Sequence, residues 1–112
     1  MSSTVTTHVL DTARGQPAAG VTVLLEKLSD AGQEEIGRAS TDADGRVRDI
    51  GPERLAAGTY RLVFAVADYF VRLDRSAFFP EVAVTFTVDG EAPHYHVPLL
   101  LSPFGYTTYR GS

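Results

Sequence analysis

The sequence predicts an all-β protein, a sandwich of about eight strands with one short helix, and two observations lead to this prediction. Apolar residues alternate with polar ones along much of the 112-residue chain, which is the period of half-buried strands. Turn signals built from Gly, Asp and Pro separate these runs at short intervals, a spacing typical of β-sandwiches. We therefore expect one domain that spans residues 1–112.

Six segments before the end of the chain have the strand pattern, and one short segment has the helical one. The expected strands are Thr4–Leu10, Val21–Leu28, Glu35–Thr41, a short piece near Val47, Tyr60–Val66 and Val82–Val88. Between the last two, Phe70 and Leu73 lie at helical spacing ahead of Phe79-Pro80. We expect a short helix over Ala67–Leu73.

The last segment is expected to form a hairpin. Ser102-Pro103-Phe104-Gly105 has the residue pattern of a type I turn. Antiparallel pairing around it sets Leu101 against Tyr106, Leu99 against Thr108 and Val97 against Arg110. Ser112 and its carboxylate then lie beside Tyr95, close to His94 and His96. Pro98 has no N–H to donate to a sheet, which predicts a sheet edge or a bulge at this position.

Composition excludes several classes of partner. The formal net charge is −4, there is one lysine, and no basic run is present, which argues against nucleic acid and anionic membranes. The chain has no cysteine, so disulfides and thiolate metal sites are excluded. No segment has the length of a membrane span or the pattern of a leader, and a cytoplasmic location is the default expectation.

The three histidines lie on two short polar strand faces. His8 shares a face with Thr4 and Thr6, away from the core, and His94 shares one with His96. A lone exposed histidine is ordinarily just solvated. These three could also form a zinc site with one open position, although that pattern is unspecific.

A second metal hypothesis fails on the sequence itself. Asp42-Ala43-Asp44-Gly45 resembles part of a calcium loop, but the position that requires Glu is occupied by Gly51. A plain turn that holds Arg46 at the start of a strand is the expected role. No metal or other cofactor is predicted. No nucleophile elbow or phosphate loop is present either, so any hydrolysis would use activated water.

Five segments together resemble one family. They are Thr7-His8-Val9-Leu10-Asp11, Gly15-Gln16-Pro17-Ala18, Thr41-Asp42-Ala43-Asp44-Gly45-Arg46, His94 to Pro103, and Tyr109-Arg110-Gly111-Ser112. In order and spacing this set is similar to the 5-hydroxyisourate hydrolases, the purine-catabolic relatives of transthyretin. The Tyr-Arg-Gly-Ser ending is the family's most specific mark. Leu-Leu-Ser-Pro and Gly-x-Pro-Ala are shared with transthyretins and therefore imply only the transthyretin-like sandwich fold.

The resemblance implies a site and an assembly. His8, Arg46, His96 and Ser112 would form the active site, with Tyr109 and Arg110 positioning the tail or the substrate, and His96 is assigned in preference to His94. The substrate would be 5-hydroxyisourate, opened to 2-oxo-4-hydroxy-4-carboxy-5-ureidoimidazoline. Either His8 or His96 would be the base that activates water. The resemblance also implies a homotetramer, a dimer of dimers, with sites where two dimers meet.

Two other functions fit parts of the same pattern. One is a transthyretin-type binding protein without turnover, which would require apolar pocket faces. The other is a structural β-sandwich module, because Gly15–Val23, Thr41–Gly45 and Ala57–Leu62 also resemble carboxypeptidase regulatory-like domains. Such a module needs neither the histidines nor the specific ending.

Overall fold

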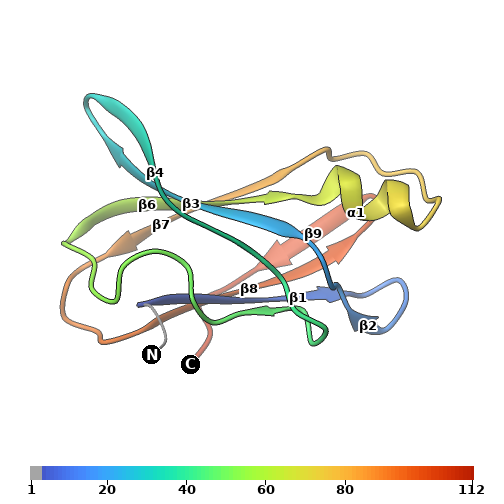
Figure 1. Ribbon diagram of the computed structural model, residues 1–112, viewed down its shortest axis with the longest axis horizontal. Helices are drawn as coiled ribbons and strands as arrows, with labels where there is room; N and C mark the ends of the chain where they lie inside the picture. Colours follow the sequence, from blue (N-terminus) through green and yellow to red (C-terminus); the bar gives the residue numbers. More distant parts are fainter. Residues whose placement is uncertain (1–3) are drawn as a thin grey trace.

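The structure is a computed structural model that describes residues 4–112, and within them it contains nine strands and one helix (Figure 1). The elements are β1 (Val5–Asp11), β2 (Gln16–Pro17), β3 (Thr22–Ser29), β4 (Gly32–Ser40), β5 (Arg46–Val47), β6 (Gly58–Ala65), α1 (Val66–Arg72), β7 (Val82–Val88), β8 (Tyr95–Ser102) and β9 (Gly105–Thr108).

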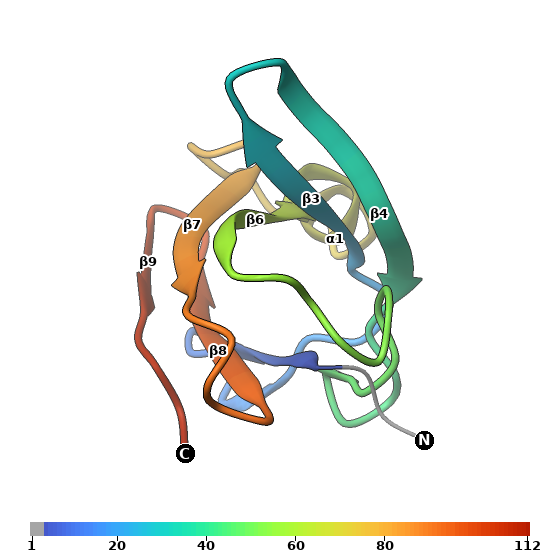
Figure 2. The same ribbon diagram turned by 90° about the vertical axis from the view of Figure 1, so that its left-hand side faces the viewer.

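The strands form two sheets that face each other. One has the order β2-β1-β8-β9, with β5 also paired to β1, and the other has the order β4-β3-β6-β7. They are the lower and upper layers of Figure 1, with α1 at one end, and Figure 2 shows them from the end opposite to α1. The predicted all-β sandwich is confirmed. The helix begins one residue earlier than expected, and the two-residue strand β2 was not predicted.

The core fills the space between the sheets. Alternate residues of β6 are buried, as are Tyr95, Val97, Leu99 and Leu101 of β8. The largest fully buried side chains are Tyr60, Phe64, Phe70, Leu25, Ile50, Leu62, Leu99 and Leu101. Since β8 alternates, burial of Tyr95 and Val97 turns His94 and His96 to the outer face of the lower sheet.

Strand β1 lies between β8 and the short strands β2 and β5. It runs parallel to β8, with Thr6 beside His96 and His8 beside Pro98. It runs antiparallel to β5, where His8 pairs with Arg46. Paired residues point to the same side of a sheet. Segments from the start, the middle and the end of the chain therefore place polar residues on one outer face.

The terminal hairpin has the predicted register, but the expectation for Pro98 was wrong in part. Leu99 pairs with Thr108 and Leu101 with Tyr106, while β8 is an internal strand between β1 and β9. Strand β9 ends at Thr108, whose hydroxyl donates to the Pro98 carbonyl at 2.7 Å. Because Pro98 cannot donate to the tail, regular pairing lapses there, and it returns as a single bridge between His96 and Gly111.

A buried carboxylate ties the end of β1 to the helix region. Asp11 is fully buried and accepts hydrogen bonds from Arg75 Nη1 and the Tyr69 hydroxyl, both at 2.7 Å. Backbone N–H groups of Ala13 and Arg14 also donate to it at 3.1 Å. Burial alone would raise the pKa of Asp11, but these hydrogen bonds and the Arg75 charge hold it below its usual value.

Replacement of this carboxylate tests its contribution. Asp11→Asn is expected to lower the free energy of unfolding by about 3 kcal/mol, because it leaves the Arg75 charge without its partner. The lowered pKa means that the carboxylate stabilises the fold above about pH 4 and that this contribution is lost as the pH falls further. Denaturant unfolding at fixed protein concentration measures both effects.

The exposed Glu34→Gln on β4 is the control, with an expected change within about 0.5 kcal/mol. Equal stability of Asp11→Asn and the wild type at pH 7 would contradict this account.

Candidate active site

The outer face of the lower sheet contains a polar hollow of about 280 Å³. Its lining includes Arg46, His94, His96 and Ser112, together with Thr6 and Arg48. Three of the four residues that the sequence assigned to an active site thus lie together, and the fourth, His8, is the ladder partner of Arg46. The hollow is open to solvent, and its volume is slightly below the range of about 300–1,000 Å³ that is usual for small-molecule sites.

The turn before β5 positions Arg46. The Asp42 carboxylate accepts from the backbone N–H groups of Asp44 and Arg46, at 2.8 and 3.0 Å. These bonds lower the pKa of Asp42, and the bond from the Arg46 backbone has the largest effect. Gly45 has φ of 76°, and a Cβ there would lie 2.3 Å from the Val9 carbonyl oxygen. The predicted turn is therefore present, and it packs tightly against β1.

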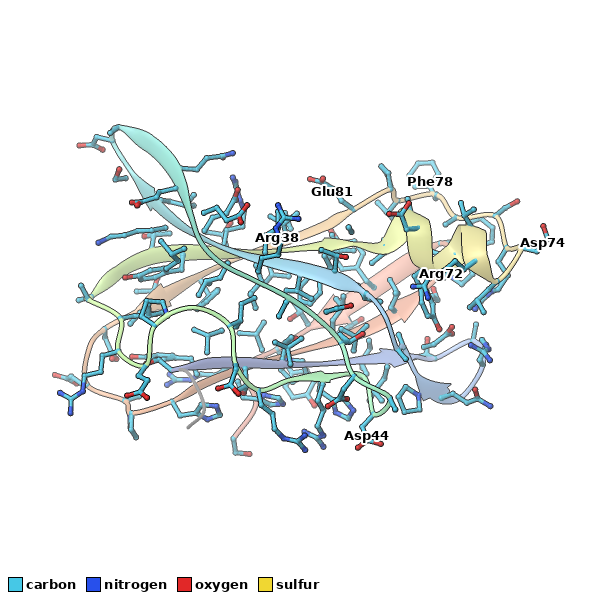
Figure 3. All side chains as sticks on the ribbon, viewed as in Figure 1. Arg38, Asp44, Arg72, Asp74, Phe78 and Glu81 are labelled. Carbon is cyan, nitrogen blue, oxygen red and sulfur yellow. The ribbon has the colours of Figure 1, made fainter. Side chains whose placement is uncertain are left out.

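His8 is held by the same turn. Its Nε2 lies 2.9 Å from the carbonyl oxygen of Asp44, on the outer side of the lower layer, where Figure 3 labels Asp44. A carbonyl only accepts, so Nε2 of His8 must have the hydrogen. The half-buried ring lies next to the hollow without lining it.

His96 and His94 are linked through a residue that the sequence argument missed. The Thr6 hydroxyl oxygen lies 2.8 Å from Nδ1 of His96 and 2.8 Å from Nε2 of His94. The two rings are nearly parallel, at 19°, with centroids 6.2 Å apart. Alternation placed Thr6 on the face of His8, but only knowledge that β1 pairs with β8 would have placed it beside His96.

His96 is kept neutral by its surroundings. Burial is the largest cause that lowers the pKa of its ring, and the positive charges of His94, Arg46 and His8 lower it further. The backbone of Thr6 raises the pKa of the ring without cancelling these effects. At pH 7 the imidazole therefore has a lone pair available to accept a proton.

The tail lies directly against this ring. The backbone N–H of Gly111 donates to the His96 carbonyl at 2.8 Å. A Cβ on Gly111 would lie 2.6 Å from Cδ2 of His96 and 3.2 Å from Cγ of Pro98. No side chain fits there, so the glycine allows the tail to bring Ser112 to the hollow.

Tyr109 and Arg110 lie elsewhere. Both line a separate hollow of about 290 Å³ beside β7 and do not line the one around Arg46. The Arg110 guanidinium is 5.0 Å from the centroid of the Tyr95 ring, and the Tyr95 hydroxyl donates to Asp89 at 2.5 Å. Arg110 therefore anchors the tail through a cation–π contact.

Residues 4–112 offer no evident metal centre. No group of three His, Asp or Glu side chains in this range is placed to hold a metal ion. Instead, one nitrogen each of His94 and His96 is engaged by the Thr6 hydroxyl. The zinc hypothesis therefore gains no support from the geometry. In the same range, no helix is both long and apolar enough to cross a membrane.

Comparison of the structure with solved ones defines its class. The Klebsiella pneumoniae 5-hydroxyisourate hydrolase has a TM-score of 0.87 and 37% identity, covering 98% of this chain and 100% of that one. Sea bream transthyretin in complex with thyroxine has a TM-score of 0.90 and 31% identity, covering 96% of this chain and 94% of that one. The protein is thus a transthyretin-like β-sandwich, as the resemblance predicted.

The sequence comparisons narrow this class. The profile of the HIUase/Transthyretin family matches residues 5–111, and the chain belongs to this family. The 5-hydroxyisourate hydrolase of Salmonella typhi is 46% identical over 112 residues, covering 99% of this chain and 82% of the relative. That of Caulobacter vibrioides is 45% identical, covering 98% of this chain and 99% of the relative.

The electrostatic environment of His96 gives a titration prediction. In the wild type, the pKa of His96 is expected below the ordinary value of about 6.5. Arg46→Gln removes one of the positive charges that lower it, so the pKa of His96 should rise in that variant. NMR titration of the histidine ring signals measures both values.

Arg38→Gln is the matched control, because Arg38 lies on β4 of the other sheet (Figure 3). It removes the same charge far from the site and should leave the pKa of His96 unchanged. A wild-type value at or above about 6.5 would contradict the proposed environment.

Proposed function

We propose that this protein is a hydrolase that opens the six-membered ring of 5-hydroxyisourate to 2-oxo-4-hydroxy-4-carboxy-5-ureidoimidazoline. The observation that supports this most is the single hollow lined by Arg46, His96 and Ser112, with His8 adjacent. Relatives that are named 5-hydroxyisourate hydrolase match almost the whole chain at 45–46% identity. The reaction needs water, a base and a donor to an oxyanion, and side chains of this site can supply the last two.

His96 is the base in this proposal. Its pKa is lowered, so the ring is neutral near pH 7. Since Nδ1 faces the Thr6 hydroxyl, Nε2 is the nitrogen left to take a proton from water. His8 is less suited to that role, because its ring lies next to the hollow without lining it. General base help of this type contributes roughly 10²–10⁴ in rate.

Arg46 stabilises the charge that develops during attack. The water proton moves to Nε2 of His96 while the water oxygen bonds to a carbonyl carbon of the six-membered ring. The carbonyl oxygen becomes an oxyanion, which the Arg46 guanidinium meets with its planar pair of N–H donors. When the C–N bond breaks, the leaving nitrogen takes the proton back from His96, and the new carboxyl group ionises.

In this proposal, the other residues that the resemblance implied, Ser112, Arg110 and Tyr109, have positioning roles. Ser112 lines the hollow, and we assign it the role of orienting an imidazole or the substrate. Arg110 stacks on Tyr95, which favours a role in fixing the tail over direct contact with substrate in its own protomer. Tyr109 is more than half exposed and is available to a neighbouring protomer.

Pure binding without turnover is the second candidate. The related sea bream structure is a transthyretin in complex with thyroxine, so this fold accommodates a binding function. An apolar ligand would require apolar walls, whereas two histidines, two arginines, two threonines and a serine line most of the hollow here. A purely structural module would require no such site. The polar lining favours catalysis on a polar heterocycle.

A homotetramer built as a dimer of dimers is part of the proposal, as is a cytoplasmic location. The site lies on the outer face of a sheet and is open, whereas small-molecule sites usually enclose most of the ligand. A second protomer over this face would supply the missing wall.

Sedimentation velocity at assay concentrations tests the assembly. We expect a species of four chains. A fully active monomer would remove the second wall from the proposal.

The activity itself is tested with 5-hydroxyisourate generated from urate by urate oxidase, with its ultraviolet decay followed with and without the protein. The wild type should accelerate the decay. Arg46→Ala should lower turnover by roughly 10²–10³, the usual cost of removing an oxyanion donor. Arg46→Lys should recover only part of it, because an ammonium lacks the planar pair of donors.

Arg38→Ala, on the opposite sheet, is the control and should retain full turnover. Circular dichroism checks that each variant is folded. Decay at the spontaneous rate in the presence of folded wild-type protein would exclude the hydrolase function.

A further inference from the structure

One hydroxyl on the outer face is shared by two imidazoles. Thr6 Oγ1 lies 2.8 Å from both His96 Nδ1 and His94 Nε2. Thr6 is buried, at 8% exposure, whereas His94 is exposed and His96 is half-buried. The hydroxyl is therefore shielded between the two rings, and both contacts have good hydrogen-bond length.

The number of hydrogens on the Thr6 hydroxyl and the two imidazoles limits which tautomers the rings can adopt. A threonine hydroxyl has one hydrogen, and a neutral imidazole has one N–H and one accepting nitrogen. If both contacts are hydrogen bonds between neutral groups, Thr6 can donate to only one ring, so it accepts from at least one of them. A ring that donates to Thr6 has its hydrogen on the nitrogen facing the hydroxyl, and a ring that accepts from Thr6 has it on the far side.

We propose that Thr6 is a positioning residue that, together with His94, holds His96 as the tautomer with hydrogen on Nδ1. In this arrangement Nδ1–H of His96 donates to the Thr6 oxygen, and the Thr6 hydroxyl donates to Nε2 of His94. Nε2 of His96 is then left with its lone pair toward the hollow. This inference rests on the proposed function, in which that nitrogen takes the proton from water.

The reverse arrangement would leave the site without its base. If Thr6 donated to Nδ1 of His96, the hydrogen of that neutral ring would occupy Nε2, which could then only donate. The effect of the Thr6 backbone on His96 raises the pKa of the ring, which is the direction expected from an acceptor beside a ring N–H. The 2.8 Å contact with the Thr6 hydroxyl and this direction are both satisfied when the ring donates toward β1.

His94 is the solvent-side end of this series of hydrogen bonds. Its exposed ring can place its own hydrogen on Nδ1, where water accepts it, while Nε2 accepts from Thr6. The nearly parallel stacking of the rings fixes their planes relative to each other. The titratable and charged groups that face His96 are His94, Arg46 and His8; a guanidinium only donates, and Nε2 of His94 faces the Thr6 hydroxyl and not His96. The Thr6 oxygen is therefore the acceptor that selects the tautomer.

The first measurement is the tautomer itself. Long-range proton–nitrogen correlation spectra of protein with ¹⁵N-labelled histidine distinguish hydrogen on Nδ1 from hydrogen on Nε2. In the wild type at pH 8, His96 is expected to have the hydrogen on Nδ1, and this signature is expected to be lost in Thr6→Val. Thr7→Val is the matched control, because Thr7 is the next residue of β1 and its hydroxyl bonds the Val97 carbonyl. That variant should leave the His96 signature unchanged.

The second measurement is turnover of 5-hydroxyisourate. Thr6→Val keeps the shape of the side chain and removes the hydroxyl, so kcat should fall at least about tenfold, as expected when a base loses its orienting partner. KM should change much less than kcat. Thr6→Ser keeps the hydroxyl and should restore most of the kcat lost in Thr6→Val.

The outcomes separate the two proposals. Hydrogen on Nε2 of His96 in the wild type would overturn the role of Thr6, whatever the activity. A Thr6→Val variant that keeps both the wild-type kcat and the wild-type His96 tautomer would also overturn it. If Thr6→Val does not fold, the wild-type tautomer and the Thr6→Ser variant still decide the question. If the wild type does not accelerate the decay, the proposed function fails, while the tautomer measurement stands on its own.

Discussion

The parallel ladder between β1 and β8 is the constraint on which the rest of the site depends. It sets Thr6 beside His96 and His8 beside Pro98, although 90 residues separate the hydrogen-bonded Thr6 and His96. Closing so long a loop costs conformational entropy before the contact forms. We therefore expect the local hairpins, such as β3–β4 and β8–β9, to form more readily than this ladder. The site therefore forms only once both sheets of the sandwich have folded.

The inner face of the lower sheet contributes to the core, and its outer face contains the candidate site. Tyr95, Val97 and Leu99 of β8 are buried in the core, while His96 of the same strand and His94 just before it line the outer hollow. An outer face contributes little to the core, so its residues can differ between proteins that share this sandwich. The related hydrolase and transthyretin structures have TM-scores of 0.87 and 0.90 against this one. In this family the residues of the outer face are therefore a better guide to function than the fold.

Local patterns predicted most of the fold. Alternation identified the long strands and their buried faces, and the Ser102–Gly105 turn gave the register of the last hairpin, because both depend on neighbours in sequence. Strand β2 is only two residues long and has no period to detect. The roles of Thr6 and His94 escaped prediction, since both depend on which distant strands pair. Pro98 was expected at a sheet edge or a bulge, but a lapse in pairing on one side is enough for an internal strand to contain it.

Gly111 shows that exposure is a poor guide to which positions of this protein can vary. It is only partly buried and lies near the surface, where most substitutions are tolerated. Yet a single methyl group there would overlap the His96 ring. In a mutational library, we expect this position to be as restricted as those of the core. The restriction would come from the ring beside it, and a selection for folding alone would underestimate it.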